Sequence, residues 1–381
     1  MTCPPATAIR PTERRQREQR LRAALAALLA DDRPAARRRL ERLLDDARRS
    51  HDLTAEIFAA ALARRLDDRP AGTNLYLRAF DRSQLSLFDL LAAHLPLVAI
   101  ARGIANRVLA DALAGADDVA LVAPGIGLGE QEADLLDELA RRGRAPRRLR
   151  VLAVDPDPDG LAQARRTLTA RARRHGIALE LLAVEGTIEG LDDEQWRRFA
   201  DAAAAAERVV VGASFALHHI AGADARDAAA ARDRVLTRLR ALDPAAIVLC
   251  EPSADHLTDD LARRFEQCLA HYSALFGLID RVDAGDAERA GMKRFFAREI
   301  EDVLAGRDDA RAERHEPAAA WVERLVRAGF VPATVVAPAL GDVDRGITVA
   351  SRPGHVAIDV DGVPLLAVVC ADPRPRNDET A

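Results

Sequence analysis

Three glycines separated by single residues follow the apolar run VALVAP (119–124), and a helical pattern begins directly after them. Glycines between a strand and a helix allow a tight turn, and they let backbone N–H groups approach a ligand at the helix N-terminus. Such glycines are also compatible with a simple turn. Their place after the first predicted strand favours cofactor binding by Gly125, Gly127 and Gly129.

An acidic side chain closes the next predicted strand, RVLAVD (150–155). In a doubly wound sheet a carboxylate at the position of Asp155 can accept hydrogen bonds from two ribose hydroxyls. The other interpretation is a helix N-cap, which Asp157 or Asp159 would provide equally well. We therefore predict that Asp155 binds the ribose of a cofactor.

Two hydroxyl side chains stand at the ends of the third and fourth predicted strands. Thr187 follows LELLAVEG (179–186), and Ser214 ends ERVVVGAS (207–214). Both positions fall at the edge of the sheet where the adenine end of a nucleoside cofactor would lie. We predict that both residues contact the cofactor, although a surface turn explains Thr187 almost equally well.

Ionisable side chains gather after the fourth and fifth predicted strands. His218 and His219 follow the fourth strand, Glu251 closes the fifth, and His256 comes shortly after it. Histidine titrates near neutral pH and can act as a general base, as can a carboxylate. We predict His219, Glu251 and His256 as catalytic residues and His218 as a substrate contact.

Simpler structural roles remain open for these groups. One histidine can pack in the following helix while the other is solvated, and Glu251 can pair with an arginine of the helical segments. The spacing of the histidines and carboxylates matches no familiar metal-ligand pattern, so no metal site is predicted.

The elements that must position these residues alternate regularly along the chain. A fifth strand at AAIVLCEP (245–252) completes a series in which strands are separated by helical patterns, which predicts a parallel sheet with helices on both faces. The segment HVAIDVDGVPLLAVVC (355–370) contains two strands around Asp361-Gly362, a hairpin signal. The predicted fold class is α/β, with a parallel sheet and a terminal antiparallel hairpin.

Helical periodicity without strand signals covers the first hundred residues and reappears late in the chain. We predict a helical cap at 12–114 and an α/β core at 115–371, with a helical insertion at about 257–327 that joins the cap. The segments 1–11 and 372–381 are rich in proline or polar residues and are predicted to be disordered tails.

Composition excludes several classes of protein. The 55 basic residues are matched by 60 acidic ones, so no basic surface for nucleic acid is expected. The longest run without a charged residue, Val209–Ala223, is too short to cross a bilayer. Four scattered cysteines and the lack of an apolar leader favour a reducing, cytoplasmic location. A homodimer is compatible with the sequence.

The order of the motifs resembles the GRAS family, the plant SCARECROW-like regulators and their bacterial relatives. The resemblance covers roughly residues 15–371. It is carried by LPLVAIARGIANRVLADAL (95–113), VALVAPGIGLGEQ (119–131), EPSADH (251–256), HYSALF (271–276), FFAREIEDVLA (295–305) and RAERHEPAAAWVERLVRAGFVP (311–332).

The resemblance implies a methyltransferase-like Rossmann fold with a helical cap. Bacterial members are expected to bind S-adenosylmethionine and to modify small molecules, whereas plant members are transcriptional regulators. By the same resemblance the glycine loop and Asp155 would hold the cofactor. The residues expected by this resemblance to line the cleft between cap and core are Asn106, His219, Glu251, His256, Tyr272 and Arg294. In this chain Ala123-Pro124 replaces the family's acidic-aromatic pair before the glycines, which removes a carboxylate near the cofactor's amino group.

The main functional hypothesis is methyl transfer from S-adenosylmethionine to a small-molecule metabolite bound between cap and core. The alternative is a catalytically inactive small-ligand-binding or regulatory, partner-binding protein on the same fold. A nicotinamide-dependent enzyme is a third, weaker hypothesis. The enzyme hypothesis requires that Glu251 and at least one histidine face a cavity contiguous with the glycine loop, with Tyr272 or Arg294 opposite.

Overall fold

The structure is a computed structural model. It describes residues 11–66, 91, 94–306, 311–338 and 346–373. The predicted tails therefore lie almost wholly outside the described residues. Two residues of the second tail, Asp372 and Pro373, belong instead to the last strand, where Pro373 pairs with Phe330.

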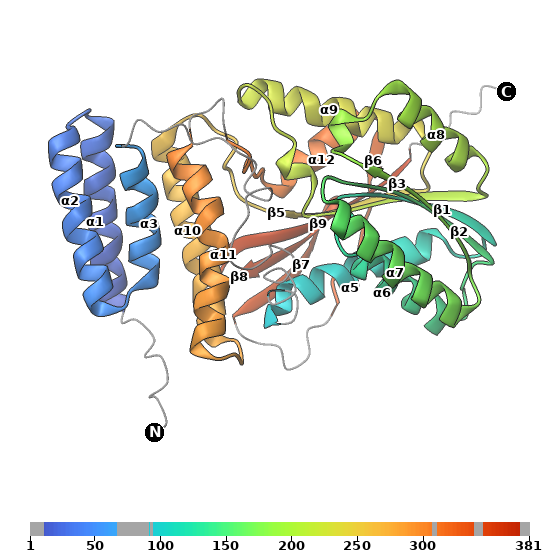
Figure 1. Cartoon of the computed structure of the whole chain (residues 1–381), viewed down its shortest axis with the longest axis horizontal. Coiled ribbons are helices and arrows are strands. Elements are labelled where there is room, and N and C mark those ends of the chain that lie inside the picture. The colour runs from blue at the N-terminus through green and yellow to red at the C-terminus, as the bar shows by residue number, and fades with distance from the viewer. Residues whose placement is uncertain (1–10, 67–90, 92–93, 307–310, 339–345, 374–381) are drawn as a thin grey trace.

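One mixed sheet runs through the described residues, and Figure 1 shows helices on both of its sides. Its nine strands are β1 (Asp118–Pro124), β2 (Arg148–Asp155), β3 (Ala178–Glu185), β4 (Arg208–Ser214), β5 (Ala246–Pro252), β6 (Phe330–Pro332), β7 (Ile347–Arg352), β8 (His355–Val360) and β9 (Val363–Pro373). Strands β1 to β5 are parallel to one another, and β6 to β9 pair in antiparallel fashion. The predicted α/β class with a mixed sheet is confirmed.

The strand order β3-β2-β1-β4-β5-β9-β8-β7 reverses direction beside β1. In open α/β sheets the crevice at such a reversal, outside the carboxyl ends of the strands, is the usual ligand site. The predicted hairpin is confirmed as β8 and β9, and Asp361 and Gly362 both adopt positive φ angles, as a type I′ turn requires. Strands β6 and β7 were not predicted.

Helices cover both faces of the sheet because the strands are apolar on both sides. Along β1, Leu121 packs into one core with α5, α6 and α7, whereas its neighbours Ala120 and Val122 pack into a second core with α8, α9 and α12. These helices are α5 (Pro96–Ala112), α6 (Glu130–Arg141), α7 (Pro158–His175), α8 (Asp193–Ala204), α9 (Ala225–Ala241) and α12 (Ala318–Arg327). Short helices η2 (Ile188–Gly190) and η3 (Leu217–His219) follow β3 and β4.

A helical layer lies beyond the sheet, at the left of Figure 1. It consists of α1 (Pro11–Leu29), α2 (Arg33–Ser50), α3 (Leu53–Arg64), α10 (Leu261–Arg281) and α11 (Asp286–Ala305). Helices α10 and α11 pack against each other, and α3 packs on α11. Ion pairs join α1–α3 to α10 and α11. Arg22 of α1 lies 2.8 Å from Glu266 of α10, and Arg64 of α3 lies 3.4 Å from Glu301 of α11. Each described helix is too short or too polar to cross a lipid bilayer.

Two parts of the predicted cap differ from the observed packing. Helix α5 falls within the range 12–114 but contacts β4, β5 and β9. Its helical periodicity shows which face is apolar and not which element covers that face. Within the predicted insertion, residues 311–317 form no helix and run as a buried connection into α12.

The contact between α3 and α10 predicts that one aromatic pair stabilises the packing of the outer helices. Phe58 is fully buried, and its ring meets Phe265 edge to face with centroids 6.5 Å apart. We expect Phe58→Ala to lower the free energy of unfolding by about 3–5 kcal/mol, because it leaves a cavity. Urea unfolding monitored by circular dichroism measures this loss. Leu29→Ala, at a half-exposed site on α1, is the control and should cost little; equal losses would show that α3 does not depend on this contact.

Candidate ligand-binding cavity

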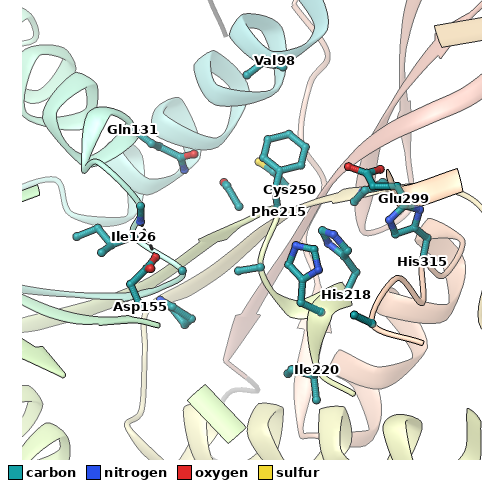
Figure 2. A pocket seen from close by; sticks show the side chains of 18 of the residues that line it. Val98, Ile126, Gln131, Asp155, Phe215, His218, Ile220, Cys250, Glu299 and His315 are labelled. Carbon is teal, nitrogen blue, oxygen red and sulfur yellow. Dashed lines mark hydrogen bonds between the residues drawn. The ribbon is translucent and has the colours of Figure 1, made fainter. Parts of the chain in front are cut away.

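A cavity of about 830 Å³ lies at the carboxyl edge of the parallel strands. Figure 2 shows Asp155 and Ile126 at one side of it and His218, His315 and Glu299 at the other. Its volume is in the range of small-molecule sites. The cavity therefore connects the glycine loop with the histidine-rich region across the reversal of strand order.

The three glycines of the loop serve different purposes. A Cβ atom at Gly125 would overlap Ala216, in the loop after β4, so this glycine allows two loops to pack together. A Cβ at Gly129 would lie 3.1 Å from Ala164 of α7. Gly127, with a φ angle of +53°, has open space beside it and lines the cavity. Only Gly125 and Gly127 are thus available to a ligand.

Asp155 holds the glycine loop in place. One carboxylate oxygen accepts the N–H of Gly127 at 2.9 Å, and the other accepts the N–H of Asp157 at 2.9 Å. Burial raises the pKa of Asp155, and these two hydrogen bonds offset part of that rise. Each carboxylate oxygen has a second lone pair, so the side chain can still accept two donors from a ligand. The alternative N-cap role falls to Asp157, which accepts the N–H of Asp159.

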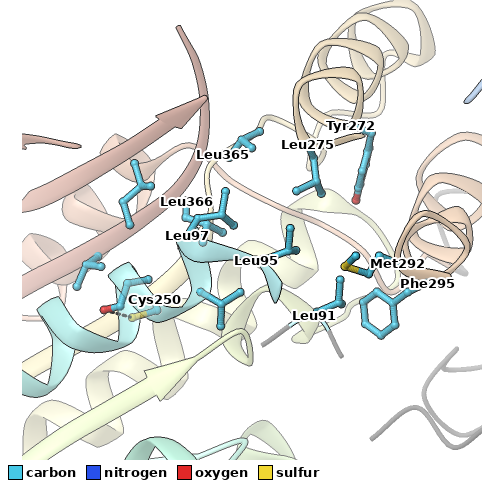
Figure 3. Close-up of a cluster of buried hydrophobic side chains, with 14 of the residues drawn as sticks. Leu91, Leu95, Leu97, Cys250, Tyr272, Leu275, Met292, Phe295, Leu365 and Leu366 are labelled. Atoms are coloured by element: carbon cyan, nitrogen blue, oxygen red, sulfur yellow. Dashed lines mark hydrogen bonds between the residues drawn. The ribbon is translucent and has the colours of Figure 1, made fainter. Parts of the chain in front are cut away.

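The middle of the cavity is apolar. Leu91, Leu95, Leu275, Phe295 and Leu366 are buried there, and Figure 3 shows how these side chains converge from the residues before α5 and from α10, α11 and β9. An apolar wall on this scale binds apolar surface of a ligand and excludes water.

A buried carboxylate organises the far end of the cavity. Glu251 is completely inaccessible to solvent; one of its oxygens accepts the N–H of Leu217 at 2.9 Å, and the other lies 2.6 Å from Nδ1 of His218. Burial raises the pKa of Glu251 to about 7, although the Leu217 N–H and the charge of Arg232 oppose the rise. Glu251 thus positions the η3 turn and does not line the cavity.

Five of the nine histidines of the chain meet next to Glu251. They are His218, His219, His256, His271 and His315. Burial is the main reason that the pKa values of His271 and His315 fall to about 3, so these rings are neutral at physiological pH. Neutral imidazole offers a nitrogen lone pair to a proton or a metal ion.

Carboxylates from two further segments complete this cluster. Glu313 comes from the buried connection 311–317, and Glu299 comes from α11, where it accepts the hydroxyl of Tyr272 at 2.7 Å. Two sets of side chains have ligand atoms within 4.8 Å of one another: His218, His219 and Glu313, and separately Glu299, Glu313 and His315. Either set has the chemistry to hold a metal ion.

The predicted site residues divide into two groups. The cavity is lined by Gly125, Gly127, Asp155, Thr187, Ser214, His218 and His219. Outside its lining are Gly129, Asn106, Glu251, His256, Tyr272 and Arg294.

The residues outside the lining have identifiable surroundings. Asn106 donates to the carbonyl of Gln131 at 2.9 Å, and His256 lies 3.0 Å from His315, nitrogen to nitrogen. Tyr272 is fully buried, and its ring stacks on that of His256. Arg294 is solvent-exposed, so the expectation that it lines the cleft was wrong.

Sequence reasoning missed Glu299, Glu313 and His315. A signal was present in RAERHE (311–316), which places five ionisable side chains in six residues of a segment that proves to be buried. A buried run of this kind requires partners elsewhere in the fold. Those partners lie on β5, η3 and α11, in separate elements that only the fold brings together.

The sheet and its cavity define an α/β protein of Rossmann-like architecture. The GRAS domain family matches residues 18–356, and the chain belongs to this family. Protein SLENDER RICE1-LIKE 1 of Oryza sativa subsp. japonica is 28% identical over 80% of this chain and 61% of its own length. The DELLA protein SLR1 of the same plant is 31% identical over 73% of this chain and 47% of its own length. The chain thus spans about half to three fifths of these relatives.

Solved structures agree with the family assignment. SCL7 of Oryza sativa superimposes with a TM-score of 0.71 at 25% identity, covering 83% of this chain and 88% of that one. The DszA carbon methyltransferase reaches a TM-score of only 0.41 at 15% identity, over 89% and 69% of the two chains. A similarity of that degree carries no argument for methyl transfer. The predicted membership of the GRAS family is confirmed.

Glu132 of α6 lines the cavity and predicts a pH dependence. Burial raises its pKa to about 7 from 4.5, and the nearby Arg102 offsets only part of the rise. The folded state therefore binds more protons than the unfolded state between pH 4.5 and 7, so this group costs stability as the pH rises through that window. We expect Glu132→Gln to stabilise the protein by about 2 kcal/mol at pH 8 and by far less at pH 4.5.

Urea unfolding at the two pH values measures this effect, with Glu130→Gln, at an exposed neighbouring position, as the control. A gain from Glu132→Gln that is the same at both pH values would contradict the assigned pKa.

Proposed function

We propose that this chain is a small-ligand-binding, regulatory member of the GRAS family that does not catalyse methyl transfer. Its ligand has a hydroxyl-bearing nucleoside end, for which S-adenosylmethionine and S-adenosylhomocysteine are the first probes. The ligand lies in the cavity with the nucleoside at the glycine loop and its remainder toward α10 and α11.

One observation carries this proposal. A single cavity joins the glycine loop to the histidine cluster, whereas Glu251, one of the predicted catalytic residues, lies outside its lining with both oxygens engaged. A catalytic base must reach the proton that it removes, directly or through one water molecule. The geometry therefore supports binding better than proton transfer.

The glycine-loop end has the features that recognise a nucleoside. Asp155 retains two lone pairs for vicinal hydroxyls, and Thr187 and Ser214 border the same part of the cavity. The backbone at Gly127 is open on the cavity side. These features support the cofactor class that the sequence predicts, used here as a bound ligand.

The residues before the glycines differ from the family pattern at the same end, and the difference affects S-adenosylmethionine and S-adenosylhomocysteine alike, because both carry a free ammonium group. Ala123 and Pro124 stand where the GRAS resemblance leads us to expect an acidic-aromatic pair, and Pro124 lines the cavity. A ligand that carries a free ammonium group would find no carboxylate from this position. Binding of S-adenosylhomocysteine and S-adenosylmethionine with similar affinity is compatible with a regulatory role.

Titration calorimetry of the purified chain with S-adenosylhomocysteine tests the ligand class. We expect Asp155→Asn to weaken binding about 10- to 100-fold, the loss of about 1–3 kcal/mol that follows removal of a charged hydrogen-bond acceptor. Gly127→Val should abolish binding, because Gly127 lines the cavity and its positive φ angle disfavours a β-branched residue. Asp159→Asn, in the first turn of α7 and exposed, is the matched control and should bind like wild type.

Two results would contradict the proposal. Failure of the wild-type chain to bind S-adenosylmethionine, S-adenosylhomocysteine or adenosine would remove the nucleoside class. Formation of S-adenosylhomocysteine from S-adenosylmethionine in the presence of a metabolite mixture, lost in Glu251→Gln, would establish the methyltransferase in its place.

A further inference from the structure

We propose that His218, His219 and Glu313 bind one divalent transition-metal ion at the end of the cavity remote from the glycine loop. These three residues are separate from those that hold the nucleoside, so a metal site can be present or absent independently of the proposed function.

The spacing of the ligand atoms is the first argument. Nε2 of His218 lies 3.6 Å from one oxygen of Glu313, and Nδ1 of His219 lies 3.5 Å from the other. Ligands held tetrahedrally at about 2.1 Å from a zinc ion are about 3.4 Å from one another. The two histidine–carboxylate distances thus match those around a shared ion, and all the ligand atoms lie within 4.8 Å of one another.

The second reason is that Glu313 is buried without hydrogen-bond donors in the part of the chain that the structure describes. Its side chain is completely inaccessible to solvent, and neither oxygen accepts a hydrogen bond from any described residue. A buried carboxylate without donors is costly, and nearly all buried polar groups in proteins have partners. A cation between Glu313 and the two histidines would supply the missing partner for both oxygens.

The residues behind the ligands are arranged as in known metal sites. Metal-binding histidines usually pass their second ring N–H to a carboxylate, which fixes the tautomer and the ring orientation. Glu251 does this for His218: it meets Nδ1 at 2.6 Å and leaves Nε2 directed toward Glu313. The N–H of Leu217 holds Glu251 in turn.

The neighbouring arginines are directed to other groups. Arg232 donates to Glu316 at 2.8 Å and to the carbonyl of His218 at 2.6 Å. Arg311 donates to the carbonyl of His256 at 2.7 Å. These hydrogen bonds hold the backbone around the cluster and leave the Glu313 carboxylate to a cation.

Two imidazoles and one carboxylate suit zinc or ferrous iron and leave coordination positions open. His218 and His219 both line the cavity, and the side chain of His219 is 25% exposed, so an ion here would be reached from the cavity. A bound small molecule could occupy an open position. His315 and Glu299 form an adjoining set of ligand atoms that also includes Glu313. Nε2 of His315 lies 3.3 Å from one oxygen of Glu313.

The test uses the full chain without a polyhistidine tag. After dialysis against a chelator, we expect titration calorimetry with Zn²⁺ to give about one ion per chain. Co²⁺ should produce the visible absorption bands of a low-coordinate, nitrogen- and oxygen-ligated ion, and the metal content of freshly purified chain distinguishes zinc from iron.

Variants assign the ligands. Glu313→Gln and His219→Gln should each weaken Zn²⁺ binding at least 100-fold and remove its effect on Tm, whereas Glu251→Gln should weaken binding about 10- to 100-fold through loss of orientation. His51→Asn removes an exposed histidine at the end of α2 and should bind like wild type. Circular dichroism of each variant without metal checks that it is folded.

Three results would overturn the proposal. Unchanged Zn²⁺ binding in both Glu313→Gln and His219→Gln would show that the ion lies elsewhere. Loss of binding in Glu299→Gln but not in His219→Gln would place the ion in the adjoining set. A wild-type chain that binds no Zn²⁺, Co²⁺ or Fe²⁺ would leave Glu313 as a buried protonated acid.

Discussion

The burial of Glu251 at the end of β5 is the constraint on which the functional end of the molecule depends. A fully buried carboxylate must be paired, and here the Leu217 N–H and the His218 ring provide the pairing. This contact fixes the turn after β4 against the end of β5. It therefore places the two adjacent histidines at the cavity and brings them opposite the connection 311–317. Removing the carboxylate would release the histidines as well as one strand end.

Different contacts form the two ends of the cavity. At the glycine loop, Asp155 ties the loop after β1 to the end of β2, which the parallel pairing of these two strands places side by side. At the other end, side chains from β5, η3, α11 and the segment before α12 converge. The apolar surface between them separates a polar recognition site from the histidine cluster. The result is a site that can contact a ligand at both ends, while Glu251 lies outside the lining of the cavity.

The sequence predicted what local periodicity and turn chemistry determine. Five parallel strands, the hairpin at Asp361-Gly362 and the meeting of His218 with Glu251 all follow from strand ends that share one sheet edge. The partners of an apolar helical face do not follow from its period, so α5 was placed in the cap although it packs on the sheet. Glu313 was missed because its neighbours approach it only through tertiary packing. The prediction that Arg294 lines the cleft was based on family resemblance alone, and this residue is exposed.

The central claim is that the cavity is a ligand site with a nucleoside end. A crystal structure of the chain grown with S-adenosylhomocysteine tests it most directly. We expect electron density for the ligand along the glycine loop, with the ribose hydroxyls within hydrogen-bond distance of Asp155 and the remainder directed toward α11. A structure in which Asp155 keeps only its bonds to Gly127 and Asp157, while side chains of the chain itself fill the cavity, would contradict a nucleoside site.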